Sequence, residues 1–139
     1  MLMNFKSNFA RLATQLYIEN KKDKSKAVCD RCIELMPNDI IPYNYFNAQI
    51  AEVYYNLKEY EKANIIIKVL VESSERELTY YFNLDQKKFN TIQEEMERQL
   101  ALFNELVKMV KRHNLPELQK DIEAKFNKLY KLYSMKSGG

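Results

Sequence analysis

Glycine and proline are scarce in this sequence. The two glycines are the last two residues, and the three prolines are Pro37, Pro42 and Pro116. Because both residue types interrupt helices, their scarcity favours long helices. We therefore expect an all-α fold.

Long apolar runs and a strong charge imbalance are also lacking. No run approaches the roughly eighteen residues that a transmembrane helix requires, and Met1 to Phe5 is too short a stretch for a signal peptide. The formal net charge of +3 is too small to indicate a nucleic-acid-binding protein by itself. With 46% hydrophobic and 29% charged residues, the chain is expected to form one soluble domain, residues 1–139. A membrane segment or targeting signal of a longer parent protein would lie outside these residues.

Metal ligands are few as well. A structural zinc site needs four ligands, and the sequence offers only Cys29, Cys32 and His113 as sulfur or imidazole ligands. A redox Cys-x-x-Cys motif belongs at a helix N-terminus that follows a strand, whereas these cysteines lie inside a predicted helix. We interpret both thiols as small apolar groups on a buried helix face, and His113 as a residue at a helix C-terminus. We therefore expect no metal, no cofactor and no catalytic residue, and thus a protein that is not an enzyme.

Apolar residues recur with helical spacing in two segments that match each other. Phe9, Leu12, Ala13 and Leu16 predict one helix, and the polar turn "ENKKDKSK" separates it from a second helix that ends at Pro37. The pattern recurs 38 residues later, pairing Leu12 with Ile50, Ala13 with Ala51, Leu16 with Tyr54, Lys22 with Tyr60, Ser25 with Ala63 and Cys29 with Ile67. This constant offset predicts two helix-turn-helix repeats, residues 6–39 and 44–76.

The repeat resembles the tetratricopeptide repeat, a helix-turn-helix unit of about 34 residues. The first copy carries the resemblance through Phe9, Leu12, Ala13, Leu16, "NKKDKS", Cys29, Cys32 and Pro37, and the second, closer copy through "IAEVYYNLKEYEKANIII". Ser25 stands where the family has a tightly packed alanine, Asn47 stands where a bulky residue is usual, and no proline closes the second copy near Glu75. The resemblance implies a superhelical stack of antiparallel helix pairs that serves as a noncatalytic scaffold for protein-protein interaction.

Two further helices are predicted after Glu75 and the short aromatic stretch "RELTYYFNL". Asp85 is expected to cap a long helix whose apolar face extends from Phe89 to Val110, and Asn114 is expected to open the last helix, with Pro116 in its first turn. We interpret residues 77–137 as a degenerate third helical unit and cap, which forms a long C-terminal helical hairpin. Two repeats alone bury too little surface, so a third helical layer is expected.

A partner-binding groove follows from the predicted stack. The first helices of successive repeats line its concave surface, so their residues outside the core stripe form the candidate site. These are Arg11, Thr14, Tyr17, Tyr45, Gln49, Glu52 and Tyr55. Tyrosine supplies large contact area at little entropic cost, which suits an interface with a protein or peptide. The alternative is that Tyr45 and Tyr55 pack between repeats, with hydroxyls that reach water or a carbonyl.

The last predicted helix is basic, which raises a second kind of surface. Its lysines are Lys120, Lys125, Lys128, Lys131 and Lys136, with Tyr130 and Tyr133 between them. Such a helix could bind anionic lipid or nucleic acid. Its apolar stripe is what packing on the preceding helix requires, so we favour packing and expect no nucleic-acid partner.

Segments from "NFARLA" to the closing "IEAKFNKLY" resemble the C-terminal region of a family of very large multi-pass membrane proteins from the Bacteroidetes. The membrane part of that family is similar to lipid-linked-sugar glycosyltransferases. This resemblance implies a soluble tail that faces the periplasm and meets the membrane only through its parent chain; otherwise the chain would be cytoplasmic. It also implies an alternative function, as an accessory domain of a membrane glycosyltransferase-like enzyme.

Overall fold

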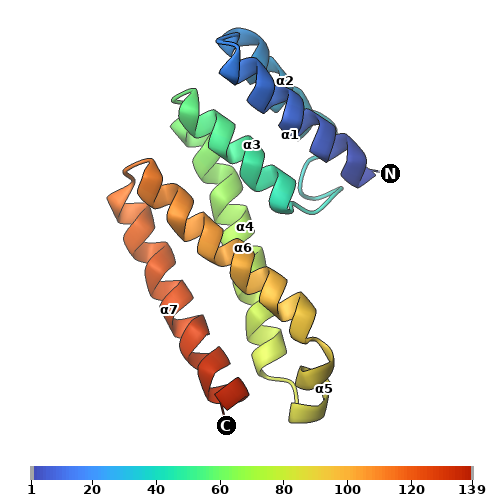
Figure 1. Cartoon of the computed structure of the whole chain (residues 1–139), viewed down its shortest axis with the longest axis vertical. Coiled ribbons are helices and arrows are strands. Elements are labelled where there is room, and N and C mark those ends of the chain that lie inside the picture. Colours follow the sequence, from blue (N-terminus) through green and yellow to red (C-terminus); the bar gives the residue numbers. More distant parts are fainter. Residues whose placement is uncertain (1, 139) are drawn as a thin grey trace. The chain divides into compact units, whose positions relative to one another are not determined.

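Residues 2–138 are described by a computed structural model, apart from the side chains of residues 2–4 and 137, and within them the chain is all-helical (Figure 1). The helices are α1 (Leu2–Ile18), α2 (Lys22–Leu35), α3 (Tyr45–Asn56), α4 (Tyr60–Phe82), α5 (Gln86–Thr91), α6 (Gln93–Arg112) and α7 (Pro116–Gly138). No strand occurs in this part of the chain. The prediction of an all-α fold is confirmed.

The chain divides into two compact units, Met1–Leu70 and Val71–Gly139. The boundary falls inside α4, which continues through it without a break. The predicted end of the second repeat, residue 76, lies six residues beyond this boundary. The single domain over residues 1–139 stays a prediction.

The first unit holds two helical hairpins whose turns match at the 38-residue offset of the sequence. In each turn one residue adopts a left-handed backbone, Asn20 with φ of 62° and Lys58 with φ of 64°. In each, the next residue donates a backbone hydrogen bond of 2.8 Å across the turn: Lys21 N to Leu16 O, and Glu59 N to Tyr54 O. These bonds span the end of the first helix, as in a Schellman-type cap. The turn between α1 and α2 is therefore repeated between α3 and α4.

Small residues bring α1 and α2 together. Ala10 and Ala13 on α1 and Cys29 on α2 are fully buried, and α1 packs against both α2 and α3. Ser25, also buried, donates a 2.7 Å hydrogen bond to the carbonyl oxygen of Ala13, so its hydroxyl is satisfied inside the core. The prediction that Leu12 lies in the core is wrong: its side chain is 50% exposed, because the alanine face of α1 is the one that makes the close contact.

A buried lysine joins α1 to the loop before α3. Lys6 is fully covered, and its Nζ donates hydrogen bonds to Pro42 O at 2.9 Å, to Asn47 Oδ1 at 2.9 Å and to Ile41 O at 3.4 Å. The same Nζ lies 5.6 Å from the centre of the Tyr43 ring. Burial lowers the pKa of Lys6, and the three oxygens together with the ring replace the water that the ammonium group would otherwise bind.

The network around this lysine also caps α3. Asn44 Oδ1 accepts a hydrogen bond from Phe46 N, and Asn47 Oδ1 accepts one from Asn44 N, both at 3.0 Å, which forms a capping box. Asn47 Oδ1 thus serves both the cap and Lys6, while its buried Nδ2 has no hydrogen-bond partner among the described residues. The loop and the start of α3 are consequently fixed to α1.

The second unit is held by aromatic contacts and by the pairing of α6 with α7. The ring of Phe82 lies 6.3 Å from that of Phe89 and 6.2 Å from that of Tyr133, and the rings of Phe103 and Phe126 are 5.7 Å apart. Such spacing is typical of favourable aromatic pairs. Ring contacts therefore join α4, α5, α6 and α7 in this unit.

Three local predictions for the second unit need correction. Most of "RELTYYFNL" belongs to α4 instead of forming a separate stretch. Asp85 caps the short helix α5 by accepting a 2.9 Å hydrogen bond from Lys88 N, and the predicted long helix is interrupted at Ile92, which is not helical. Asn114 does not open α7; with φ of 56° it ends α6 in the left-handed conformation that also ends α1 and α3, and α7 begins at Pro116.

The substitution Lys6→Met should lower the free energy of unfolding by about 1–3 kcal/mol, because Pro42 O loses the Lys6 donor and Asn47 Oδ1 keeps only the hydrogen bond from Asn44 N. Urea unfolding followed by circular dichroism measures this. The matched control Lys24→Met removes an exposed lysine from α2 and should change stability by less than about 0.5 kcal/mol. Equal stability of the two variants would contradict a structural role for the Lys6 ammonium.

Candidate functional site

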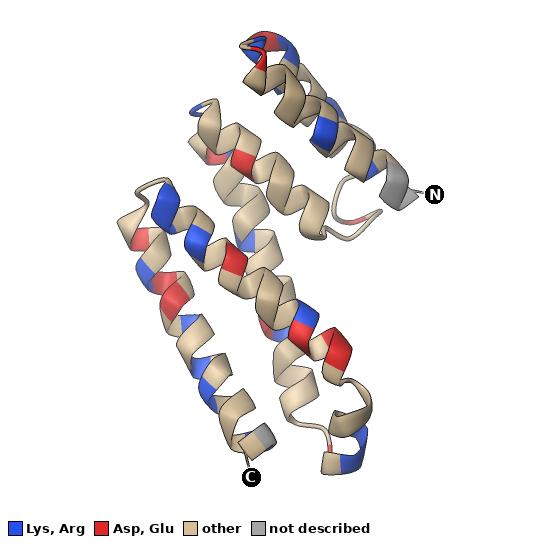
Figure 2. Ribbon diagram, viewed as in Figure 1, with Lys and Arg blue, Asp and Glu red and all other residues tan. Residues whose placement is uncertain are grey.

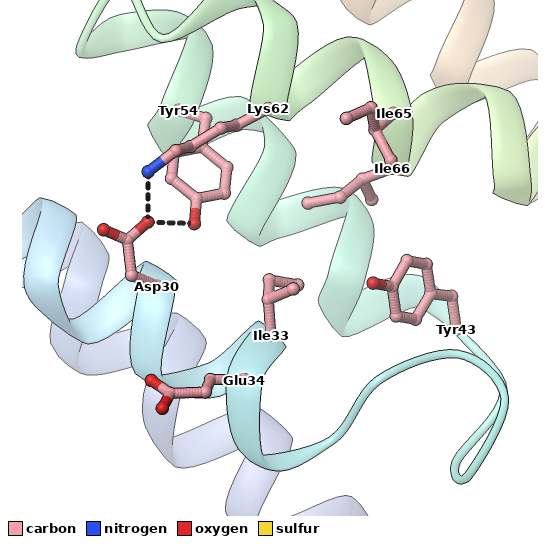
Figure 3. Close-up of a pocket in the computed structure, with 8 residues that line it drawn as sticks. All are labelled: Asp30, Ile33, Glu34, Tyr43, Tyr54, Lys62, Ile65 and Ile66. Atoms are coloured by element: carbon pink, nitrogen blue, oxygen red, sulfur yellow. Dashed lines mark hydrogen bonds and ion pairs between the residues drawn. The ribbon is translucent and has the colours of Figure 1, made fainter.

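A pocket of about 310 Å³ opens on the first unit, between α2, α3, α4 and the loop that precedes α3 (Figure 3). It is lined by Asp30, Ile33, Glu34, Tyr43, Tyr54, Lys62, Ile65 and Ile66. The volume is at the small end of the range for ligand sites, and it suits one or two side chains of a partner.

One end of the pocket is polar. Asp30 Oδ1 accepts a 2.6 Å hydrogen bond from the Tyr54 hydroxyl and a 2.9 Å hydrogen bond from Lys62 Nζ, drawn as dashed lines in Figure 3. Partial burial works to raise the pKa of Asp30, but these two bonds and the lysine charge outweigh it and leave the pKa lowered. Burial and the bond to Asp30 raise the pKa of Tyr54. The Asp30 carboxylate is therefore charged and already hydrogen-bonded to Tyr54 and Lys62, so we interpret it as a structural part of the pocket lining.

The rest of the pocket is apolar. Ile66 is buried, Ile33 is half-buried, and Ile65 on the rim is 62% exposed. The Tyr43 ring closes the side formed by the loop, as Figure 3 shows, and its backbone N–H donates a 3.0 Å hydrogen bond to Asn38 Oδ1. Because the Lys6 ammonium lies over this ring, Tyr43 is held in place from α1 as well.

The charge of the lining is slightly negative. Asp30 and Lys62 neutralise each other, whereas Glu34 lies at the edge and pairs only loosely with exposed Arg31, at 3.7 Å. An exposed pair of this kind contributes little, so the Glu34 carboxylate is accessible to another cation. The pocket thus fits an apolar side chain whose neighbours are neutral or basic.

None of the residues predicted to form the groove lines this pocket. Arg11 and Thr14 are exposed, Tyr17, Gln49 and Glu52 are half-buried, Tyr45 is exposed and Tyr55 is buried. Tyr55 is 1% exposed, and its hydroxyl donates a 2.6 Å hydrogen bond to Asn64 Oδ1. A partner on that face would therefore reach Tyr45 but little of Tyr55.

The run of three isoleucines at residues 65–67 is a sequence feature that could have indicated the pocket. Ile65, Ile66 and Ile67 are consecutive, and successive residues of a helix point about 100° apart, so they cannot all face one core. Ile66 and Ile67 are buried, and Ile65 is left at the surface beside the pocket. A run of three large apolar residues in an amphipathic helix thus indicates that at least one of the three side chains is exposed.

The two cysteines lie in the packed interior of the first unit. Burial, together with the nearby Asp30 and Cys32, raises the pKa of Cys29 to about 12, and burial also raises the pKa of Cys32. No group of three or more histidine, cysteine, aspartate or glutamate side chains that could hold a metal is found among the described residues. The thiols occupy positions where they pack as small apolar groups.

The lysines of α7 do not form a uniform basic surface. Figure 2 shows acidic residues in the first half of the helix, which are Glu117, Asp121 and Glu123, and lysines alone among the charged residues of the second half. Lys136 Nζ donates a 2.6 Å hydrogen bond to Leu84 O and lies 5.8 Å from the Phe89 ring. Part of the predicted basic set is thus used within the second unit.

None of the helices in residues 2–138 has the length and apolar character needed to span a membrane. Comparison of the chain with protein-family models, with curated proteins and with solved structures gives no significant match.

Replacing Tyr54 with phenylalanine should lower the free energy of unfolding by about 1–2 kcal/mol at pH 7, since the lost hydroxyl donates to a partly exposed carboxylate. The lowered pKa of Asp30 adds stability above the ordinary carboxyl pKa, and this stability is lost as the pH falls toward the lowered value. The cost of Tyr54→Phe should accordingly shrink between pH 7 and about pH 3 in urea titrations. Tyr45→Phe, at an exposed ring, is the control. A cost that does not change with pH would refute the role of Asp30.

The native thiols should be almost unreactive. Thiolate is the reacting form, and a pKa near 12 leaves very little of it on Cys29 at pH 8. Labelling by a chromogenic disulfide reagent at pH 8 should be at least about a thousandfold slower in buffer than in denaturing urea for both cysteines. Rapid labelling of one thiol in the folded chain would place it at the surface.

Proposed function

We propose that the chain is a noncatalytic helical-repeat scaffold that binds a protein partner through an apolar side chain. The observation that carries the proposal is the pocket between α2 and α4, with three isoleucines and two tyrosines around it and its partly buried Asp30 carboxylate already bonded. A pre-formed apolar pocket with few polar groups is typical of a site that takes an anchor residue.

The repeat organisation supports the same function. Two hairpins at a 38-residue offset with the same left-handed turn are what a tetratricopeptide-like unit would present, and such units are used to bind peptides and proteins. The pocket lies between the second helices of the two hairpins, α2 and α4, next to the loop that joins α2 to α3. This differs from the predicted groove on the first helices, which remains a second possible contact surface.

The partner segment should combine an apolar anchor with basic or neutral neighbours. Leucine or phenylalanine would lie against Ile33 and Ile66, and a lysine or arginine beside it could reach the carboxylate of Glu34. A flanking acidic residue would meet that carboxylate and be disfavoured. The specificity of the site would come from this charge at its edge.

A nuclear magnetic resonance titration of the 15N-labelled chain tests this function. The probe is an acetylated, amidated pentapeptide with a central leucine between two lysines, and the comparison peptide has two glutamates instead. The lysine peptide should shift the amide signals of Ile33, Tyr43 and Ile66, and Ile65→Glu should weaken its binding at least about tenfold. The matched control is Ile18→Glu, which charges an exposed isoleucine on α1 that does not line the pocket.

Three outcomes would count against the proposal. They are the absence of shifts at the pocket, equal shifts with both peptides, and binding that survives Ile65→Glu. Shifts confined to Tyr45, Gln49 and Glu52 would instead favour the groove predicted from the sequence.

A further inference from the structure

The outward side of α1 carries an apolar stripe that the first unit leaves uncovered. The stripe consists of Phe5, Phe9, Leu12 and Leu16, at spacings of four, three and four residues, and is called the outer stripe below. Phe5 is 54% and Leu12 50% exposed, and Phe9 and Leu16 are half-buried. These spacings place all four side chains on one face of the helix, next to the face that packs on α2 and α3.

The same face of α3 shows what such a stripe packs against. The residues that follow the outer stripe by 38 positions are Tyr43, Asn47, Ile50 and Tyr54. Asn47, Ile50 and Tyr54 are buried, and two of them bind the preceding hairpin: Asn47 accepts from Lys6 on α1, and Tyr54 donates to Asp30 on α2. On α3, therefore, this face is the interface with the helix hairpin α1–α2.

The register of the comparison is fixed by the backbone. Asn20 and Lys58 are the left-handed residues of the two turns, and they too are 38 residues apart. Leu16 and Tyr54 accept the equivalent 2.8 Å hydrogen bonds that close these turns. Phe9, Leu12 and Leu16 on α1 therefore correspond to Asn47, Ile50 and Tyr54 on α3, whereas Phe5 corresponds to Tyr43 in the loop before α3. The outer stripe thus continues an interface that is already formed one repeat later.

The side chains of the outer stripe are apolar, so contact with a helix hairpin is more favourable for them than contact with water. Where α3 has Asn47 and Tyr54, which need polar partners, α1 has Phe9 and Leu16, which need none. The neighbouring surface residues Asn8 and Gln15 are uncharged, and they form hydrogen bonds with the exposed side chains of Arg11 and Glu19. The hairpin that covers α3 has small residues in its interior, which are Ala10, Ala13, Cys29 and Cys32.

We propose that the outer stripe of α1 binds a helix hairpin of the α1–α2 type, which covers Phe5, Phe9, Leu12 and Leu16 as the hairpin α1–α2 covers α3. This interface lies on a different face from the pocket and does not rest on the function proposed above. It would extend the repeat by one unit, toward a hairpin supplied by another polypeptide segment.

The test joins an extra copy of residues 2–39 to the start of the full chain through a flexible glycine-serine linker of about ten residues, which is long enough for the hairpin to fold back. Leu12→Cys is made in the original α1 only, and its labelling by a maleimide is timed in the chain with and without the added hairpin. The native cysteines are buried and give little background. The added hairpin should slow labelling at least about tenfold and raise the melting temperature by about 4 °C or more.

Two controls are matched to this design. Tyr80→Cys, at an exposed position of the second unit, should label at the same rate in both chains. Leu12→Lys in the original α1 should lower the melting temperature of the extended chain but leave that of the original chain nearly unchanged, because Leu12 is half exposed there.

Equal labelling of the Leu12→Cys thiol in both chains would overturn the proposal, as would an added segment that gains no helical circular dichroism signal. A third outcome is protection of the thiol in the original chain that increases with protein concentration, together with a dimer in sedimentation. This would assign the outer stripe to a second copy of the chain and also refute the hairpin.

Discussion

The buried ammonium group of Lys6 imposes the main constraint on the first unit. A charge enclosed by protein needs oxygens at close range, and here the chain supplies two carbonyls of the loop before α3 and the amide oxygen of Asn47. That oxygen also completes the cap of α3, so one atom links α1, the loop and the next hairpin. Tyr43 lies over the ammonium on one side and lines the pocket on the other. The shape of the pocket therefore depends on a charge that lies behind it.

A second constraint is the size of the residues between α1 and α2. Alanine, serine and cysteine at the contact let the two helices approach closely, and the bulkier residues of α1 are then turned away from it. The first unit consequently has two apolar surfaces on different faces, the pocket between α2 and α4 and the outer stripe of α1. In the second unit, ring pairs such as Phe82–Phe89 and Phe103–Phe126 contribute to the packing of the helices.

The helices could be predicted from the sequence because their apolar periodicity and their turns are local features. The polar network could not, because Lys6 and Asn47 are 41 residues apart and each looks like a surface residue by itself. Two of the three departures from the repeat pattern make buried hydrogen bonds: Asn47 accepts one from Lys6, and Ser25 donates one to the carbonyl oxygen of Ala13. The pocket escaped prediction for a similar reason, since its lining comes from three helices and a loop that meet only in the folded chain. Leu12 was misplaced because a pattern of apolar residues does not reveal which of two adjacent faces makes the closest contact.

The turns that end α1, α3 and α6 each carry backbone strain, because none of them has a glycine at its left-handed position. Asn20, Lys58 and Asn114 hold a left-handed backbone, which glycine adopts without strain and which an ordinary side chain adopts at a cost of about 1–2 kcal/mol. Asparagine tolerates this conformation well, whereas lysine does not, so the strain is greatest at Lys58. With no glycine before residue 138, the chain forms all three of these turns from residues that carry a side chain. Glycine at these positions, above all at position 58, could therefore strengthen the fold without altering the core, the pocket or the outer stripe.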